Sequence, residues 1–175
     1  MNINRQYSYV GPHDLRQLLQ QPSQRAWIRH PDDILNWIKA TKPTLQPDKT
    51  IIATFVIDTS QVLWIADRHS EHVVCAAGQT VLSAGEITFE IQGNQLEVIE
   101  VTNQSTGYCP EPESWWIVEY VLSQIGLPHP LTFTTEFIFR RCDKCGTTNI
   151  VKDMWFECAV CQAPLSQHWN YDQHL

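Results

Sequence analysis

The feature that most constrains this chain is a pair of Cys-x-x-Cys motifs near its C-terminal end. Cys142 and Cys145 form the first motif, and Cys158 and Cys161 form the second after twelve intervening residues. This spacing matches a tetrahedral Zn(Cys)4 site, in which each motif turns in a tight knuckle and directs both thiolates to one ion. Two disulfides or four unrelated cysteines are the other interpretations. Because four thiolates leave no open coordination position, we expect one structural Zn²⁺ per chain.

The residues around these cysteines suit the two knuckles. Gly146 follows the first motif, where the backbone often needs a positive φ, whereas Gln162 takes the equivalent place after the second motif. Residues 149–157 predict two short strands around the polar pair Lys152-Asp153. Together these features resemble a zinc ribbon, which we assign, with its tail, to residues 140–175.

Composition and length restrict the class of protein. The 175 residues include 43% hydrophobic residues and seven Trp, enough for one domain core with a small appendage. No apolar run approaches the ~18 residues of a membrane span, and no secretion signal is recognised, so neither is expected. Cys75 and Cys109 stand far apart in sequence, and four metal-binding thiols suit a reducing compartment. We therefore predict a cytoplasmic location and no membrane partner.

Charge is distributed unevenly along the chain. Residues 1–49 hold seven Lys/Arg against four Asp/Glu, residues 50–135 hold one against ten, and residues 136–175 hold four against five. A nucleic-acid-binding protein normally carries a basic stripe that neutralises phosphates. The acidic middle of this chain would repel a phosphate backbone, so nucleic acid is an unfavoured partner.

Two helices are predicted before residue 50. Pro12 occupies a first helical position, and leucines at helical spacing follow it as far as Gln21-Pro22. A second helix begins at Pro31, has Asp32 and Asp33 in its first turn, and ends before Lys42-Pro43. The segment up to residue 49 then reads as a linker.

Beyond residue 50 the hydrophobic period becomes that of β-strands. Alternation of polar and apolar residues around the turn Gly93-Asn94 predicts a hairpin with one wet, acidic face. The expected strands are residues 51–57, 62–66, 73–76, 86–91 and 95–101. A helix should follow from Pro112 to the stop at Gly126, and residues 131–139 should rejoin the sheet as a last strand.

These elements predict an α+β fold. We expect an antiparallel β-meander or partial barrel with one packed helix, two N-terminal helices and a C-terminal zinc ribbon. The predicted division is an N-terminal helical segment (1–49), a β-meander plus helix domain (50–139) and the ribbon with its tail (140–175).

Three short motifs in the strand region are rich in residue types found in functional sites: residues 69–72, 83–86 and 103–112. The stretch of roughly residues 65–125 resembles a group of uncharacterised bacterial proteins. There a histidine, an Ala-Gly-Glu step and an Asn-x-Ser-Gly-x-Tyr-x-Pro loop follow one another along a β-meander. Here Thr106 is inserted before Gly107, and Cys109 follows Tyr108. The resemblance implies a bacterial source and a shape, and it implies no reaction.

One interpretation of these motifs is an enzyme. Cys109 precedes a predicted helix N-terminus, where the thiol pKa can fall, so it is a candidate nucleophile. His72 (or His69) would be its base and Glu86 (or Asn103) the orienting group of a hydrolase or transferase. Against this, nearby glutamates disfavour a thiolate, and a lone cysteine in a loop is more often a packing residue.

The other interpretation is a binding protein. Asn103 and Tyr108 in the loop, with Trp116 and Trp155, are the candidate binding residues, because Trp is enriched at the centres of protein interfaces. We expect a non-enzymatic adaptor or recognition subunit of a bacterial multi-protein system that binds a protein partner or a small ligand. The enzyme using Cys109, His72 and Glu86 is the alternative, and a nucleic-acid-binding zinc ribbon is the weaker alternative.

Overall fold

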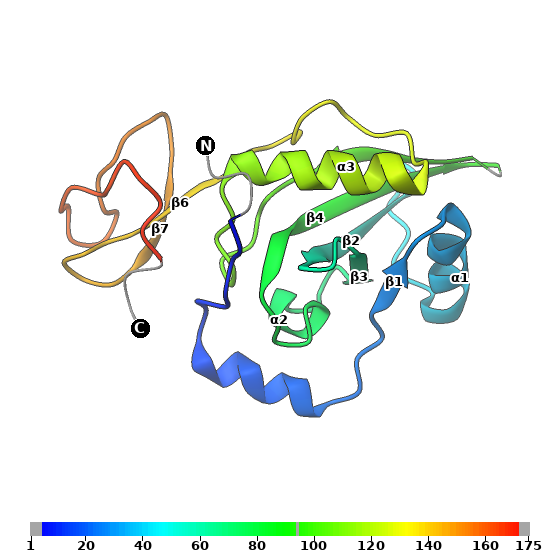
Figure 1. The fold of residues 1–175 in the computed structure, drawn as a ribbon, viewed down its shortest axis with the longest axis horizontal. Coiled ribbons are helices and arrows are strands. Elements are labelled where there is room, and N and C mark those ends of the chain that lie inside the picture. The colour runs from blue at the N-terminus through cyan, green and yellow to red at the C-terminus, as the bar shows by residue number, and fades with distance from the viewer. Residues whose placement is uncertain (1–4, 94, 172–175) are drawn as a thin grey trace.

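The computed structural model describes residues 5–93 and 95–171 and has the predicted α+β class. An open antiparallel sheet of five strands in the order β1-β3-β2-β4-β5 forms its centre (Figure 1). The strands are β1 (Ala26–Ile28), β2 (Thr50–Asp58), β3 (Leu63–Asp67), β4 (Val81–Gln92) and β5 (Gln95–Val101). The expected meander is therefore interrupted, because β1 joins the far side of β3 and β4 pairs with β2.

The middle of the sheet is closely packed around β2. Phe55 on β2 lies opposite Ile65 on β3 and Gly85 on β4. Gly85 itself lies against the chain that follows β5, since an added Cβ would stand 1.9 Å from the carbonyl oxygen of Thr102. Only glycine allows the two backbones to approach so closely here.

Helices cover both faces of the sheet. Helices α1 (Pro31–Thr41) and α3 (Trp115–Ile125) contribute to the larger core on one face, with α2 (His72–Cys75) on the opposite face (Figure 1). Alternation along β2 divides the two cores, since Phe55 belongs to the first and Val56 to the second. A short 3₁₀ turn, η2 (Pro112–Ser114), leads into α3, which ends at Gly126 with φ 81° as predicted.

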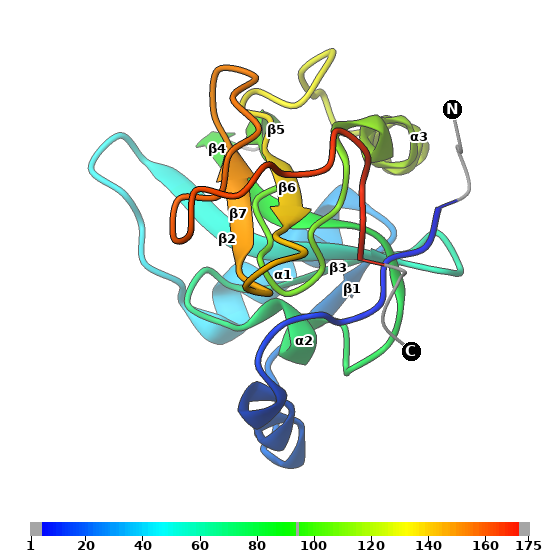
Figure 2. The same ribbon diagram turned by 90° about the vertical axis from the view of Figure 1, so that its left-hand side faces the viewer.

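Both N-terminal helices are confirmed. The first, η1 (His13–Gln20), is a 3₁₀ helix with no buried residue, and it lies at the periphery of the molecule, apart from the sheet (Figure 2). The second, α1, starts at Pro31 as predicted. A reciprocal cap holds its start: the His30 side chain accepts from the Asp32 backbone N–H, and the Asp33 carboxylate accepts from the His30 backbone N–H.

Three details of the predicted sheet are wrong. Residues 73–76 form part of the short helix α2 and its cap, where the backbone N–H groups of Cys75 and Ala76 donate to Glu71 and His72. The β-branched residues of this segment favour a strand, but these local backbone hydrogen bonds form a helical turn instead. The strand that completes the five is β1, which lies inside the predicted helical segment 1–49 and whose Ile28 is buried in the main core.

The third wrong detail is the predicted last strand, residues 131–139: this segment covers the outer edge of β5 but does not join the sheet as a strand. Thr135 makes a single parallel bridge to Thr102, and the backbone N–H of Thr134 donates to Val101 at 2.8 Å. Pro128 accepts from the backbone N–H of Val98. These contacts satisfy backbone groups that an uncovered edge strand would expose. Within the described ranges, no helix has the length and apolar character needed to cross a membrane.

Candidate metal centre

The ribbon projects from one end of the main sheet (Figure 1). Its two strands, β6 (Ile138–Arg141) and β7 (Thr148–Val151), pair antiparallel, with Phe139 opposite Ile150. The predicted pairing of two strands around Lys152-Asp153 is reduced to one bridge, between Lys152 and Trp155. The partner of β7 is therefore the strand before the first Cys-x-x-Cys motif.

Both Cys-x-x-Cys motifs form knuckles with the same hydrogen bonds. In the first, Gly146 donates its backbone N–H to Cys142, and Cys142 donates to Thr147. In the second, Gln162 donates to Cys158, and Cys158 donates to Ala163. The residue after each motif has a left-handed backbone, with φ 75° at Gly146 and 58° at Gln162. The glycine prediction is thus confirmed for the first knuckle, and the second uses the same conformation with a non-glycine residue.

The knuckles bring all four cysteine sulfurs together. The four Sγ atoms lie within 4.8 Å of one another, with 3.5 Å between Cys142 and Cys161 and 3.6 Å between Cys145 and Cys158. A tetrahedral ion with Zn–S bonds of about 2.3 Å would hold its sulfurs about 3.8 Å apart. None of the four is in a disulfide. The cluster is therefore suited to one metal ion with four sulfur ligands.

Polar groups around two of the four sulfurs support the thiolate form, whereas burial and the neighbouring cysteines raise the pKa of Cys161 to about 11. The backbone N–H of Cys161 donates to the Cys158 sulfur and is the largest cause that lowers the Cys158 pKa, to about 6. The hydroxyl of Thr147 likewise lowers the pKa of Cys145. Since a metal binds thiolate and not thiol, hydrogen bonds of this kind favour metal binding at neutral pH.

Asn149 orients the second knuckle and was not singled out from the sequence. Its amide donates to the Cys158 sulfur at 3.5 Å, and its oxygen accepts from the backbone N–H of Ala159 at 2.9 Å. The side chain is buried on β7, so it joins the β6–β7 hairpin to the second knuckle. A polar residue on a ribbon strand carries no periodic signal that would identify this role.

The candidate nucleophile Cys109 lies away from the cysteine cluster. It is buried beside Phe139 and Tyr171, and its sulfur lies 3.4 Å from the carbonyl oxygen of Thr106. Burial raises the pKa of Cys109 to about 12, so the thiol is protonated at neutral pH. Burial and a raised pKa are typical of a packing cysteine, and a nucleophilic role for Cys109 stays a prediction.

The candidate base and orienting group have other partners. His72 donates Nε2–H to the carbonyl oxygen of Gly85 at 3.0 Å, and burial lowers the His72 pKa to about 4. Glu86 follows on β4, where its backbone N–H faces the Thr102 hydroxyl at 3.4 Å. In the described residues no hydrogen bond joins Cys109, His72 and Glu86, and the enzyme interpretation stays a prediction.

Three of the four candidate binding residues lie in internal contacts. Asn103 is fully buried and donates to the carbonyls of Pro110 and Phe137 at 2.8 Å each, which holds the loop 103–110 to the chain that enters the ribbon. Tyr108 is buried and donates to the Gln79 carbonyl, and Trp116 packs on the main core. Trp155, in contrast, is exposed on the ribbon. Binding by these residues stays a prediction.

The residues that dock the ribbon on the sheet were also not predicted. Arg140 on β6 makes a two-point ion pair with Glu111, with N–O distances of 2.7 and 3.2 Å. The chain after the second knuckle returns to the same place, where the Trp169 indole donates to the Cys109 carbonyl at 2.7 Å and meets Tyr7 edge-on. Charged and aromatic residues far apart in sequence give no pattern that identifies such a junction.

Comparisons with protein-family models, curated proteins and solved structures give no match to this chain. The resemblance to uncharacterised bacterial proteins is therefore not supported by a family match, and the cysteine cluster is the main evidence on function.

Proposed function

We propose that this protein is a non-enzymatic recognition subunit that uses a zinc ribbon to bind a protein partner in a bacterial, cytoplasmic multi-protein system. The observation that carries the proposal is a group of large apolar side chains exposed on the ribbon. The most exposed of them are Trp155 at 69%, Met154 at 68% and Val160 at 67%. With Ile150 they make up four of the nine exposed large hydrophobic residues found in the described chain.

Zinc is the ion that best suits the cysteine cluster. Four thiolates in a tetrahedral arrangement select Zn²⁺ among the common divalent ions of the cell. Filled coordination supplies no catalytic position, so the ion would act only on structure. It would fix the two knuckles and thereby the chain segments on which Met154, Trp155 and Val160 stand.

The turn that carries two of these side chains is strained. Asp153 and Met154 have positive φ values of 50° and 56°, although neither is glycine. Left-handed backbone costs a non-glycine residue roughly 1 kcal/mol. Strain of this kind is often kept where a side chain must be presented in one orientation, and here the turn presents Met154 and Trp155 to solvent.

Exposure on a rigid module favours binding. An apolar side chain that is already ordered loses little conformational entropy on association, and Trp contributes strongly at interface centres. The surroundings of Cys109 also support a binding role, since burial raises the pKa of its thiol to about 12 and so disfavours the thiolate that nucleophilic catalysis would use.

The test combines metal analysis with partner capture by matched variants. The native chain and the variants Trp155→Ser, Leu131→Ser and Cys142→Ser are purified, and zinc per chain is measured by mass spectrometry. Leu131 is the control because it is 84% exposed and lies outside the ribbon. Each protein is then immobilised and incubated with extract of its own host.

We expect one zinc per chain in the native, Trp155→Ser and Leu131→Ser proteins. The native and Leu131→Ser proteins should retain one common partner, and Trp155→Ser and Cys142→Ser should lose it. Equal capture by native and Trp155→Ser proteins at equal zinc content would refute the ribbon as the binding surface. Absence of bound zinc from the native protein would refute the role of the metal.

A further inference from the structure

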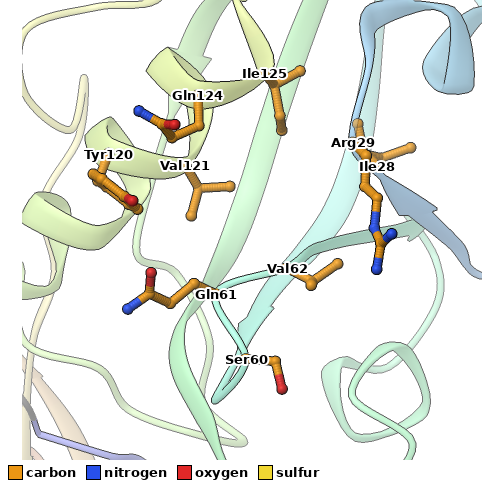
Figure 3. A pocket seen from close by; sticks show the side chains of 9 residues that line it. All are labelled: Ile28, Arg29, Ser60, Gln61, Val62, Tyr120, Val121, Gln124 and Ile125. Atoms are coloured by element: carbon orange, nitrogen blue, oxygen red, sulfur yellow. The ribbon is translucent and has the colours of Figure 1, made fainter.

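A small groove lies between α3 and β1, far in sequence from the ribbon residues of the proposed function. It has a volume of about 270 Å³. Tyr120 and Gln124 of α3 stand on one side, Arg29 stands on the other, and Gln61 of the β2–β3 turn lies between them (Figure 3). The sequence analysis did not predict a groove at this place.

The lining of the groove has two chemical parts. Its apolar part comes from Ile28, Val62, Val121 and Ile125, and its polar part from the rim residues and Ser60. No acidic residue lines it, although residues 50–135 hold ten Asp/Glu against one Lys/Arg. Arg29, which comes from the more basic segment 1–49, is therefore the charged residue among those that line the groove.

The exposed Arg29 side chain is oriented by a stack in which two tryptophan rings lie between two guanidinium groups. Its guanidinium carbon lies 4.0 Å from the centre of the Trp27 ring, and Trp27 stacks on Trp64 with a centroid distance of 6.3 Å. Arg25 lies 3.9 Å over Trp64. The stack follows from strand register, since Trp27 on β1 is directly opposite Trp64 on β3. Such contacts orient a guanidinium and leave its N–H groups free.

The positive charge of Arg29 is not neutralised by a neighbouring acid. Among residues 5–93 and 95–171, no carboxylate oxygen lies within 4.0 Å of the Arg29 guanidinium. The nearby Asp33 carboxylate accepts from the backbone N–H of Arg29 at 2.9 Å and so fixes the backbone and not the charge. An oriented, unpaired guanidinium beside an apolar surface is a site for an anion that has an apolar part.

We infer that this groove binds a small organic acid: a carboxylate held by Arg29 and an aromatic or branched aliphatic group on Ile28, Val62 and Ile125. Gln61 and Gln124 offer amide groups to a further polar atom of the ligand. The volume is below the about 300–1,000 Å³ of pockets for drug-sized molecules, so the ligand is small. The same chemistry occurs in a free acid and in the C-terminal residue of a peptide.

The inference is independent of the ribbon, because it uses neither the cysteines nor Trp155. The test is a titration of the ¹⁵N-labelled full chain, followed by two-dimensional NMR. The probes are 3-phenylpropionate and its neutral amide, and the tripeptide Ala-Gly-Phe with a free or an amidated C-terminus. The variants are Arg29→Gln and, as a matched control, Arg16→Gln, whose native guanidinium lies 5.1 Å over Tyr9 outside the groove.

We expect an acid probe to shift the amide signals of Ile28, Val62 and Val121. Its amide should bind at least about tenfold more weakly, because a charge-assisted hydrogen bond is lost. Arg29→Gln should weaken the acid by the same factor, and Arg16→Gln should leave it unchanged. The tighter of the two acids identifies the source of the ligand, free or peptide-borne.

Equal affinity of acid and amide, or an acid affinity unchanged in Arg29→Gln, would overturn the assignment. Shifts confined to residues outside the groove, or no shift with any probe, would overturn it as well. None of these outcomes bears on the ribbon, so failure here is distinct from failure of the proposed function.

Discussion

Replacing Glu111 by Gln would leave the Arg140 guanidinium at the junction of ribbon and sheet without a counter-charge. The native pair is nearly dry, since the Arg140 side chain is 5% exposed and that of Glu111 is 12% exposed. Both nitrogens at the end of Arg140 face Glu111 oxygens, at 2.7 and 3.2 Å. The free energy of unfolding should therefore respond strongly to loss of the negative charge.

The expected magnitude follows from the remaining partners. Removal of one member of a buried ion pair costs about 3–5 kcal/mol, because the other charge stays buried. Arg140 keeps the carbonyls of Phe139 and Gln167 as acceptors, and its Nε has no partner in the described structure. Because these carbonyls are retained, we expect Glu111→Gln to lower the free energy of unfolding by about 3 kcal/mol, the lower limit of that range. For a chain of this length that corresponds to a fall in Tm of about 6–12 °C.

The assay is thermal and denaturant unfolding of zinc-saturated protein, monitored by tryptophan fluorescence, in a double-mutant cycle. The cycle compares the native chain with Glu111→Gln, Arg140→Gln and the double variant. Glu113→Gln is the control, because Glu113 is exposed and forms no ion pair among the described residues. It should change stability by no more than about 0.5 kcal/mol.

A coupling energy between Glu111 and Arg140 of about 2 kcal/mol would agree with a buried pair. The reasoning would be refuted if Glu111→Gln behaved like Glu113→Gln. It would also be refuted if the two single changes were simply additive, because the two side chains would then act independently.

Two further predictions concern titratable groups whose pKa is shifted by the fold. Because burial lowers the His72 pKa to about 4, the unfolded chain takes up a proton below pH 6.5 that the folded chain does not, so acid destabilises the fold. Between pH 7 and 5 the native protein should lose about 2 kcal/mol of unfolding free energy more than His72→Gln does, measured by guanidinium denaturation; parallel curves would contradict this. For Cys109, whose pKa burial raises to about 12, we expect alkylation by iodoacetamide at pH 7.5 to be about 10³-fold slower than for a free cysteine, as read by peptide mass spectrometry. Rapid labelling at Cys109 of zinc-loaded protein would favour the enzyme alternative.

Much of the fold could be predicted because its signals are local. Helix α3 has apolar residues at helical spacing between Pro112 and Gly126, and α1 has a proline and two acids at its start. The hairpins β2–β3 and β4–β5 alternate around recognisable turns. The spacing of the four cysteines predicts a metal site, and the structure brings their sulfurs together as expected.

The rest depends on contacts that sequence patterns do not carry. Strand β1 has three residues, too few for a period to be read, and its place is set by pairing of Trp27 with Trp64. Helix α2 contains two valines that favour a strand, but backbone hydrogen bonds to the Glu71 carbonyl and packing of Cys75 on the sheet stabilise the helical turn. The groove and its charge arise from α3, β1 and a turn meeting in space. For the same reason, the internal roles of Asn103 and Tyr108 could be seen only in the fold.

The return of the chain after the second knuckle has a consequence for how the molecule is made. Trp169 and Tyr171 cover Cys109 and Phe139. Trp169 also packs against Tyr7, an N-terminal residue that forms a bridge to Val81. During synthesis all four metal ligands are complete at Cys161, before these aromatic residues exist. The candidate metal ligands are therefore made before the residues that close this core. Closure over Tyr7 requires Trp169 and Tyr171, which follow all four cysteines in the chain.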